Sequence, residues 1–314
     1  MNIWLLLAAF GLDLMLGDPR FLHHPVVTIG TLINWLETVL ASLLDNRFIA
    51  GFLLCGSVLL VTGGVTWLVL FLACFLHPVV YAVVSLYIAY TTIALRQLHI
   101  ESHEVVQLVE RGDLEAARRA LALIVGRDTA RLDEEQILRA CIETVSENSS
   151  DGVIAPLFYL FIGGPVLAMI YKAANTLDSM VGYRDDRYRE MGMVSARVDD
   201  LLNLIPARLT GLLMVVAAFP LGLNPWAALK VMLRDARKTG SPNAGFPEAA
   251  AAGALGIQIG GPAVYFGTEI DKPTLGDPDR EINIERYRAM IRLMYVTSFL
   301  ALALGAFLSW PFRM

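Results

Sequence analysis

Long runs without charge alternate with shorter polar segments along this chain. Residues 48–95 contain no Asp, Glu, Lys or Arg. Because one transmembrane helix needs about 20 apolar residues, this run predicts two spans joined by a tight turn. His77-Pro78 is the best candidate for the turn, since proline breaks a helix interior; Gly63-Gly64 is the alternative.

Three further apolar runs predict additional spans. Residues 293–312 are uncharged and include Trp310, a residue type that favours the membrane interface. Residues 209–229 are also uncharged, although two prolines interrupt them. Residues 3–16 predict a span that carries Asp13, and they lack the basic start and the cleavage site of a signal peptide. The pattern predicts an all-α, polytopic integral membrane protein with about four to six transmembrane helices.

Two other apolar runs are interrupted at their centres by Gly-Gly-Pro. One covers residues 153–171 with its break at 163–165, and the other covers 249–268 with its break at 260–262. Irregular backbone at membrane depth is tolerated only where protein buries it or where it lines a cavity. We therefore expect re-entrant or broken helical hairpins that line a site, with plain kinked spans as the alternative.

Residues 96–152 form a polar insertion between apolar runs. Asp113 predicts the N-cap of one helix. Asp133 and Gln136 have the spacing of a capping box and predict the start of a second helix. We expect this helical insertion to belong to a single integral membrane domain of residues 1–314.

The composition agrees with a membrane protein. Hydrophobic residues make up 56% of the chain and charged residues 18%, and the mean hydropathy is +0.56; soluble domains have about 45–50% apolar and about 25% charged residues. The net charge is −5 without a basic run, so nucleic acid is not expected as a partner. The three cysteines form no C-x-x-C pair, which argues against a disulfide framework or a zinc site.

A stripe of charge follows the second predicted helix of the insertion. Arg139, Glu143 and Glu147 are spaced to share one helix face, and Asp151 follows. A solvated surface stripe is one interpretation. The stripe, however, runs directly into the apolar segment that begins at Val153. Carboxylates beside a membrane-facing cavity suit Mg²⁺, which prefers oxygen ligands.

Residues 171–188 mix carboxylates with cations. Asn175 and Asp178 would share a helix face, and Asp185 lies in a stretch flanked by arginines. Such a mixture suits a metal–phosphate site, because carboxylates hold the cation while Arg and Lys hold the phosphate. Arg208 lies at the edge of a span, where an ionisable residue is functional or extends to the interface. No Gly-Lys dipeptide occurs, so any nucleotide is bound without a P-loop.

Several short segments match the motifs of a known family in the same order. They are residues 14–19 with 24–25, 126–129, 143–152, 155–159, 171–183, 196–200, 206–210 and 241–245. Together they resemble the adenosylcobinamide-phosphate synthase family of cobalamin biosynthesis, the CobD/CbiB type. The resemblance extends from about residue 11 to residue 290.

The resemblance implies a ligase that uses ATP and Mg²⁺. It would join a carboxylate of adenosylcobyric acid to the amine of aminopropanol phosphate, or of a related amino alcohol. It also implies a multi-pass protein in the lipid bilayer of the cytoplasmic (inner) cell membrane, with a cytoplasmic active site because ATP is used there. A homo-oligomer, or an assembly with other membrane enzymes of the corrinoid pathway, stays open.

The candidate site residues fall into two sets. Catalytic and Mg²⁺-binding roles are expected for the acids Glu143, Glu147, Asp178 and Asp185. Contacts to phosphate, carboxylate or corrin amides are expected for Arg127, Lys172, Asn175, Arg184, Arg197, Arg208 and Asn243.

Two other functions are compatible with parts of this pattern. Asn175-x-x-Asp178 with later paired acids also resembles the aspartate-rich diphosphate sites of membrane prenyl- or phospho-alcohol transferases. A non-catalytic membrane regulator on the same scaffold is the other alternative. It predicts eroded acidic motifs, whereas the acidic motifs here are intact.

Overall fold

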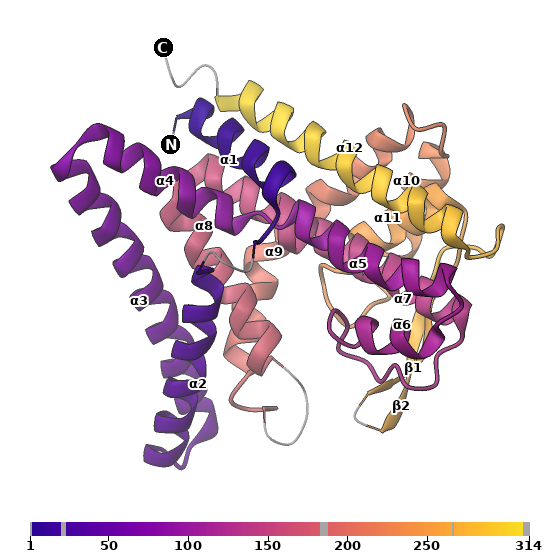
Figure 1. Cartoon of the computed structure of the whole chain (residues 1–314). Coiled ribbons are helices and arrows are strands. Elements are labelled where there is room, and N and C mark those ends of the chain that lie inside the picture. The colour runs from indigo at the N-terminus through magenta and orange to yellow at the C-terminus, as the bar shows by residue number, and fades with distance from the viewer. Residues whose placement is uncertain (1, 20–22, 183–187, 266, 310–314) are drawn as a thin grey trace. The chain divides into compact units, whose positions relative to one another are not determined.

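The computed structural model describes residues 2–19, 23–182, 188–265 and 267–309, and it consists mostly of α-helices (Figure 1). The helices are α1 (Ile3–Leu16), α2 (Pro25–Leu43), α3 (Arg47–Leu76), α4 (Pro78–Thr92), α5 (Leu95–Glu110), α6 (Leu114–Leu121), α7 (Glu134–Asn148), α8 (Ala155–Val181), α9 (Met193–Ala218), α10 (Pro225–Asp235), α11 (Gly245–Leu255) and α12 (Ile284–Ser309). A π-helical turn, η1 (Ser149–Ile154), separates α7 from α8. Two strands, β1 (Ile259–Tyr265) and β2 (Thr268–Leu275), lie between α11 and α12.

Within the described residues, six helical segments are long and apolar enough to cross a membrane. They are Pro25–Leu43, Arg47–Leu76, Pro78–Glu110, Glu134–Val181, Met193–Ala218 and Ile284–Leu308. The predicted turn at His77-Pro78 is confirmed: Pro78 opens α4, and the His77 side chain accepts a hydrogen bond from the backbone N–H of Val79 at 3.1 Å. The prediction of an all-α polytopic membrane protein is therefore confirmed.

Two predicted spans differ from the helices of the structure. The apolar run at residues 209–229 is not one span, because α9 ends at Ala218 and Pro225 opens the separate helix α10. The span instead reaches back to Met193 through a more polar first half. Helix α1 forms at the predicted residues but has only 14 of them, about 21 Å of helix, which is too short to cross the hydrocarbon core alone.

The break predicted at residues 163–165 is present. Helix α8 loses helical geometry at Gly164, where φ is 64° and ψ is −158°, and Pro165 follows. Only glycine adopts this region without steric cost, and proline removes a helix hydrogen bond. The structure therefore has two helical pieces joined by a kink, which matches the alternative of a kinked span rather than a re-entrant hairpin.

The second Gly-Gly-Pro segment was interpreted wrongly as part of a helical hairpin. Helix α11 ends at Leu255, and residues 259–275 form an antiparallel β-hairpin. Gly260 and Gly261 have φ values of 80° and 89°, which a helix excludes, and they form an irregularity in the register of β1. Pro262 fits because strands without neighbours on one side tolerate a missing N–H. The alternating burial along β1 is typical of a strand.

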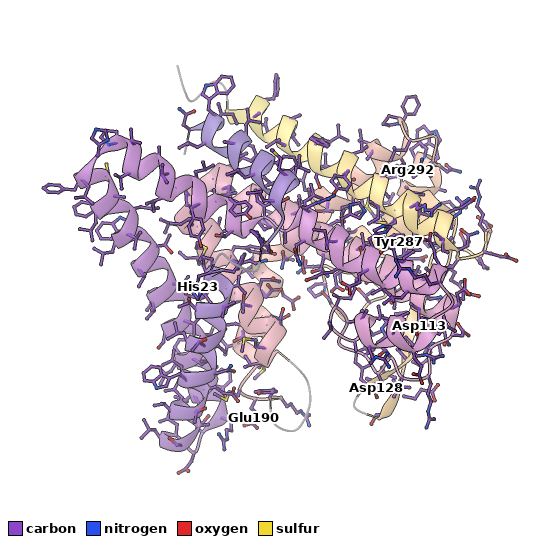
Figure 2. All side chains as sticks on the ribbon, in the orientation of Figure 1. His23, Asp113, Asp128, Glu190, Tyr287 and Arg292 are labelled. Atoms are coloured by element: carbon purple, nitrogen blue, oxygen red, sulfur yellow. The ribbon has the colours of Figure 1, made fainter. Side chains whose placement is uncertain are left out.

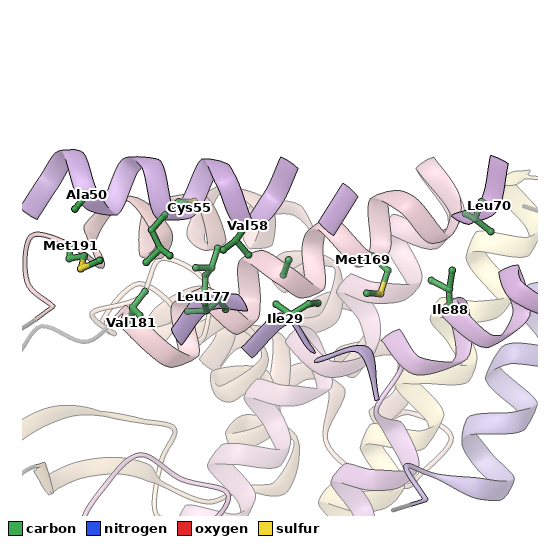
Figure 3. Packing of buried hydrophobic residues seen from close by; sticks show 13 residues of the cluster. Ile29, Ala50, Cys55, Val58, Leu70, Ile88, Met169, Leu177, Val181 and Met191 are labelled. Carbon is green, nitrogen blue, oxygen red and sulfur yellow. The ribbon is translucent and has the colours of Figure 1, made fainter. Parts of the chain in front are cut away.

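The chain divides into two compact units, and the first comprises Met1–Ala94, Ala155–Asn203 and Gly305–Met314. Its core lies where α3 packs on α2, α4 and α8. Cys55 and Val58 of α3 face Leu177 of α8 in this core (Figure 3). The opposite side of α3 exposes large apolar residues such as Leu60 and Phe71, as expected of a helix that faces lipid.

The second unit comprises Leu95–Ile154 and Leu204–Leu304. Asp133 and Gln136 form the predicted capping box at the start of α7, and Asp113 caps α6 as predicted. Helix α10 packs on α11, and α5 and α6 pack on α7. Buried Tyr287 of α12, labelled in Figure 2, bonds through its hydroxyl to Ser102 of α5 at 2.9 Å. The predicted polar insertion is thus one part of a larger helical unit.

A buried carboxylate fixes the end of α10 in this unit. Asp235 has a fully buried side chain, and it pairs with Arg234 at 2.7 Å and Lys238 at 2.6 Å. It also accepts the backbone N–H of Gly276 at 2.9 Å. These bonds, led by the one from Arg234, hold the pKa of Asp235 well below its ordinary value.

We predict that Asp235→Asn lowers stability by about 2 kcal/mol at neutral pH, because it leaves two cations without their carboxylate. A depressed pKa contributes stability that is present above the ordinary Asp pKa, about 3.9, and is lost as the pH falls through the folded-state value. The melting temperature of the wild-type protein in detergent should therefore approach that of the variant below about pH 4. A constant gap between the two proteins from pH 7 to pH 3 would contradict this.

Candidate functional site

Arg127 and Glu143 form a buried ion pair in the second unit. Arg127 lies in the loop after α6, and Glu143 lies in the middle of α7. The other oxygen of Glu143 accepts the backbone N–H of Gly260 in β1 at 2.7 Å. Burial opposes the charge on Arg127, but the carboxylate of Glu143 outweighs it and raises the pKa of the guanidinium. Both residues were predicted site residues, and the fold brings them together.

Two more carboxylates lie close to this ion pair. Glu248 is in the first turn of α11 and interacts electrostatically with Glu147 and Glu143. Burial, followed by the charges of these two acids, raises the pKa of Glu248 well above its ordinary value, against the opposing effect of Lys272 and Arg127. The group therefore favours a proton or a cation at this position.

We predict that Glu248→Gln makes the protein more stable at alkaline pH. When a folded-state pKa is raised, the folded protein binds the proton more tightly than the unfolded chain does. Stability then falls as the pH rises above the ordinary Glu pKa, about 4.3. The neutral glutamine removes this loss, so the variant should melt above the wild type at pH 8 and close to it at pH 4.5. Melting curves in detergent check this, and an equal difference at both pH values would contradict it.

An open pocket of about 800 Å³ lies between the 122–139 segment and the β1–β2 hairpin. Asp128 connects its two sides: the Gly267 N–H donates to the Asp128 carboxylate at 2.9 Å, and the Asp128 N–H donates to the Val264 carbonyl at 2.8 Å. Figure 2 shows Asp128 beside the hairpin. The pocket is lined by Ala122, Arg127, Asp128, Thr129, Ala130, Arg131, Leu132, Gln136, Arg139, Gly260, Pro262, Ala263, Val264, Gly267 and Glu269.

Arg208 and Asn243, both predicted site residues, are in contact. The Arg208 guanidinium donates to the Asn243 side-chain oxygen at 3.2 Å and to the Leu204 carbonyl at 2.7 Å. It also lies over the ring of Phe246, 4.3 Å from the centroid. Arg208 is therefore held toward the 241–246 loop rather than extended into solvent.

The first unit holds a separate group of acids on α8 and α9. Asp178 is close enough to Asp199 and Asp200 for their charges to interact. Asp199 is buried and accepts hydrogen bonds from Asn203 at 3.0 Å and from Asn175 at 3.4 Å. The predicted pair Asn175 and Asp178 thus belongs to a larger acid–amide cluster.

Tyrosines extend this cluster into the core of the first unit. Tyr171 is buried and donates its hydroxyl proton to the Asn203 side chain at 2.9 Å. Its ring stacks on that of Tyr159 at 5.0 Å, and Tyr159 donates to the Leu202 carbonyl at 2.7 Å. These contacts fix the amide that holds Asp199.

Lys172 lies in a different charged group of the first unit. It interacts electrostatically with Asp18 and His24, which are 3.7 Å apart between carboxylate and ring. Burial raises the pKa of Asp18 and lowers that of His24, so it opposes the charge on both. His24 also caps α2 by accepting the Val26 N–H at 3.3 Å.

The predicted site residues are distributed over both units. The second unit contains Arg127, Glu143, Glu147, Arg208 and Asn243, and the first contains Lys172, Asn175, Asp178 and the exposed Arg197. Arg184 and Asp185 lie outside the described residues. Where the structure describes the chain, no three His, Cys, Asp or Glu side chains are placed to hold a metal ion. The Mg²⁺ site stays a prediction.

Three acids of these groups were not among the predicted site residues. In the sequence, Glu248 ends the turn-rich 241–248 stretch, which adjoins the second Gly-Gly-Pro segment. This position could have identified it as a candidate site residue. Asp199 and Asp200 belong to the 196–200 motif. Their role could have been inferred from adjacent acids at the start of an apolar helix.

Comparison with known proteins gives a consistent result over nearly the whole chain. Residues 6–294 match the family model described as CobD/Cbib protein. Cobalamin biosynthesis protein CobD of Geobacter metallireducens is 52% identical over 300 residues, which cover 96% of this chain and 94% of the relative. CobD of Listeria monocytogenes is 46% identical (95% and 96% covered), and cobalamin biosynthesis protein CbiB of Salmonella typhimurium is 48% identical (94% of each). No solved structure matches the chain.

Proposed function

Because the chain belongs to the CobD/CbiB family of cobalamin biosynthesis, we propose that it is an adenosylcobinamide-phosphate synthase. It joins a carboxylate of adenosylcobyric acid to the amine of aminopropanol phosphate, or of a related amino alcohol, at the expense of ATP. The observation in the structure that supports this most is the association of Arg127 with the acids Glu143, Glu147 and Glu248.

The proposed reaction has two steps. A carboxylate oxygen of the corrinoid attacks the γ-phosphorus of ATP, which forms an acyl phosphate and releases ADP. The neutral amine then attacks the acyl carbon, the C–O bond to phosphate breaks, and inorganic phosphate leaves. The amine begins as an ammonium ion, so one proton must go to a base whose pKa is near the working pH.

The second unit contains groups suited to these steps. Both oxygens of Glu143 are engaged, one by Arg127 and one by Gly260, so we assign Glu143 the positioning of Arg127. The fixed guanidinium has further N–H groups for a phosphate or carboxylate oxygen. Glu248, with its raised pKa, is the candidate that accepts the amine proton.

The residues also fit Mg²⁺. Mg²⁺ keeps several waters and binds through substrate phosphates and only one or two carboxylates, so it does not need three protein ligands. Glu147, whose charge interacts with that of Glu248 in the second unit, would supply such an oxygen. The ion would neutralise charge on the phosphoryl group.

We propose that the site faces the cytoplasm, where ATP is available, and that the protein lies in the cell membrane; the six apolar helical segments support a multi-pass membrane protein. Purified protein in detergent, supplied with adenosylcobyric acid, aminopropanol phosphate, ATP and Mg²⁺, tests the proposal. We expect equal amounts of adenosylcobinamide phosphate and ADP; without the amine we expect no adenosylcobinamide phosphate and no more than about one ADP per enzyme. Pyrophosphate release without ATP from a prenyl or phospho-alcohol substrate would support a transferase instead, and no turnover by well-folded protein would refute the ligase.

A further inference from the structure

We propose that the pocket between the 122–139 segment and the β1–β2 hairpin binds a nucleoside triphosphate. This inference rests on the proposed use of ATP, and it assigns the nucleotide to one place in the second unit. The basic residues of the pocket, its apolar residues and its volume support this assignment.

Part of the pocket lining is basic. Arg127, Arg131 and Arg139 line the pocket, together with the two carboxylates of Asp128 and Glu269. Glu143 fixes Arg127 and Glu135 holds Arg139, whereas none of the ion pairs formed by the described residues uses the exposed Arg131. A planar, permanently charged guanidinium matches the oxygens of a phosphate group.

Arg139 adds a second observation. Its Nε atom is buried in the protein and has no hydrogen-bond partner among the described residues. Buried donors are normally satisfied. We therefore expect an anion bound in the pocket to accept a hydrogen bond from this side chain.

Apolar residues also line the pocket. Pro262, Ala263 and Val264 come from β1, and Leu132 comes from the 122–139 segment. A ligand with one polyanionic end and one flat, weakly polar end suits both the basic and the apolar residues. A nucleotide has this form, whereas aminopropanol phosphate has no ring to cover the apolar residues.

Size separates the remaining candidates. Pockets for drug-sized ligands have about 300–1,000 Å³, and this one has about 800 Å³. Aminopropanol phosphate would fill a small part of it. The corrinoid is larger than the ligands that such pockets enclose. The nucleotide is the one substrate of the proposed reaction that matches in volume and in charge distribution.

The test compares two arginines of the same insertion. Arg131→Ala removes an exposed guanidinium of the pocket, and Arg119→Ala removes one that pairs with Glu115 on α6 and does not line it. Binding of radiolabelled ATP with Mg²⁺ is measured by equilibrium dialysis against purified protein in detergent, without other substrates. We expect Arg131→Ala to raise the Kd about tenfold, as for loss of one charge-assisted contact. Arg119→Ala should leave it unchanged.

Kinetics then separates this inference from the proposed function. Arg131→Ala should raise the KM for ATP and leave the KM for aminopropanol phosphate unchanged, and Arg131→Lys should fall between. The inference is overturned if Arg131→Ala and Arg139→Ala both leave ATP binding within about twofold of wild type, or if the KM for aminopropanol phosphate rises instead. If ATP binding follows the expected pattern but no amide forms, the proposed function fails and the nucleotide site stands.

Discussion

Arg127→Ala is expected to reduce amide formation at least about 100-fold, the range for loss of one preorganised charge-stabilising donor. It should also cost about 3 kcal/mol of stability, because removal of one partner of a buried ion pair leaves the other charge uncompensated. Glu143 is only 5% exposed, and its remaining bond to the Gly260 N–H does not neutralise it. Turnover and the melting temperature in detergent measure the two effects.

A double variant separates the two effects. In Arg127→Ala with Glu143→Gln, neither partner of the ion pair leaves an uncompensated charge, so the melting temperature should return most of the way to wild type. Turnover should stay low, because the guanidinium is still absent. Recovery of both would show that Arg127 acts only through stability. Wild-type turnover in Arg127→Ala alone would remove this arginine from the site.

The parts of the fold that the sequence predicted are those with a strong local cause. Proline after His77 ends one helix and opens the next whatever packs around it, and the capping box at Asp133 is satisfied within four residues. Gly164 breaks α8 because no other residue type adopts its backbone geometry without cost. In each case, interactions within a short segment are strong enough to determine its conformation.

The failures arose where local signals allow two outcomes. A Gly-Gly-Pro inside an apolar run breaks a helix, and it also suits an irregular strand. At residues 260–262 the strand prevails, since β1 finds a partner in β2 and Glu143 binds the Gly260 N–H. The span expected at 209–229 failed for a related reason: hydropathy alone does not show that the helix continues back to Met193.

For the site as well, the sequence indicates which residues are involved but not which of them contact each other. Charged residues beside apolar segments suggested Glu143 and Asp178 as site residues, and the family motif at residues 126–129 suggested Arg127. Neither signal predicts that Arg127 pairs with Glu143, because that contact depends on how the loop after α6 returns to α7. Glu248 reaches the same group from α11, and such long-range contacts have no signature in a single sequence.

Asp178→Asn is expected to abolish turnover, with a loss of at least about 100-fold, the range for removing a group that transfers a proton, while the protein stays folded. The reason lies in its neighbours. The charges of Asp199 and Asp200 interact with that of Asp178, so a neutral amide relieves repulsion between like charges. Asp199 keeps its bonds to Asn203 and Asn175 in the variant.

The combination of outcomes decides what Asp178 does. If Asp178 mainly stabilises the fold, its replacement should lower the melting temperature. If it holds Mg²⁺ or accepts a proton, its replacement should reduce turnover and leave the melting temperature unchanged or higher. Ser179→Ala is the matched control: it changes the next, exposed residue of α8 and removes only a hydrogen bond to the Asn175 carbonyl. Full activity in Asp178→Asn would remove Asp178 from the residues that the sequence predicts to act in catalysis or to bind Mg²⁺. Lost activity with a lower melting temperature would make Asp178 structural, because repulsion from Asp199 and Asp200 should otherwise make the neutral side chain the more stable one.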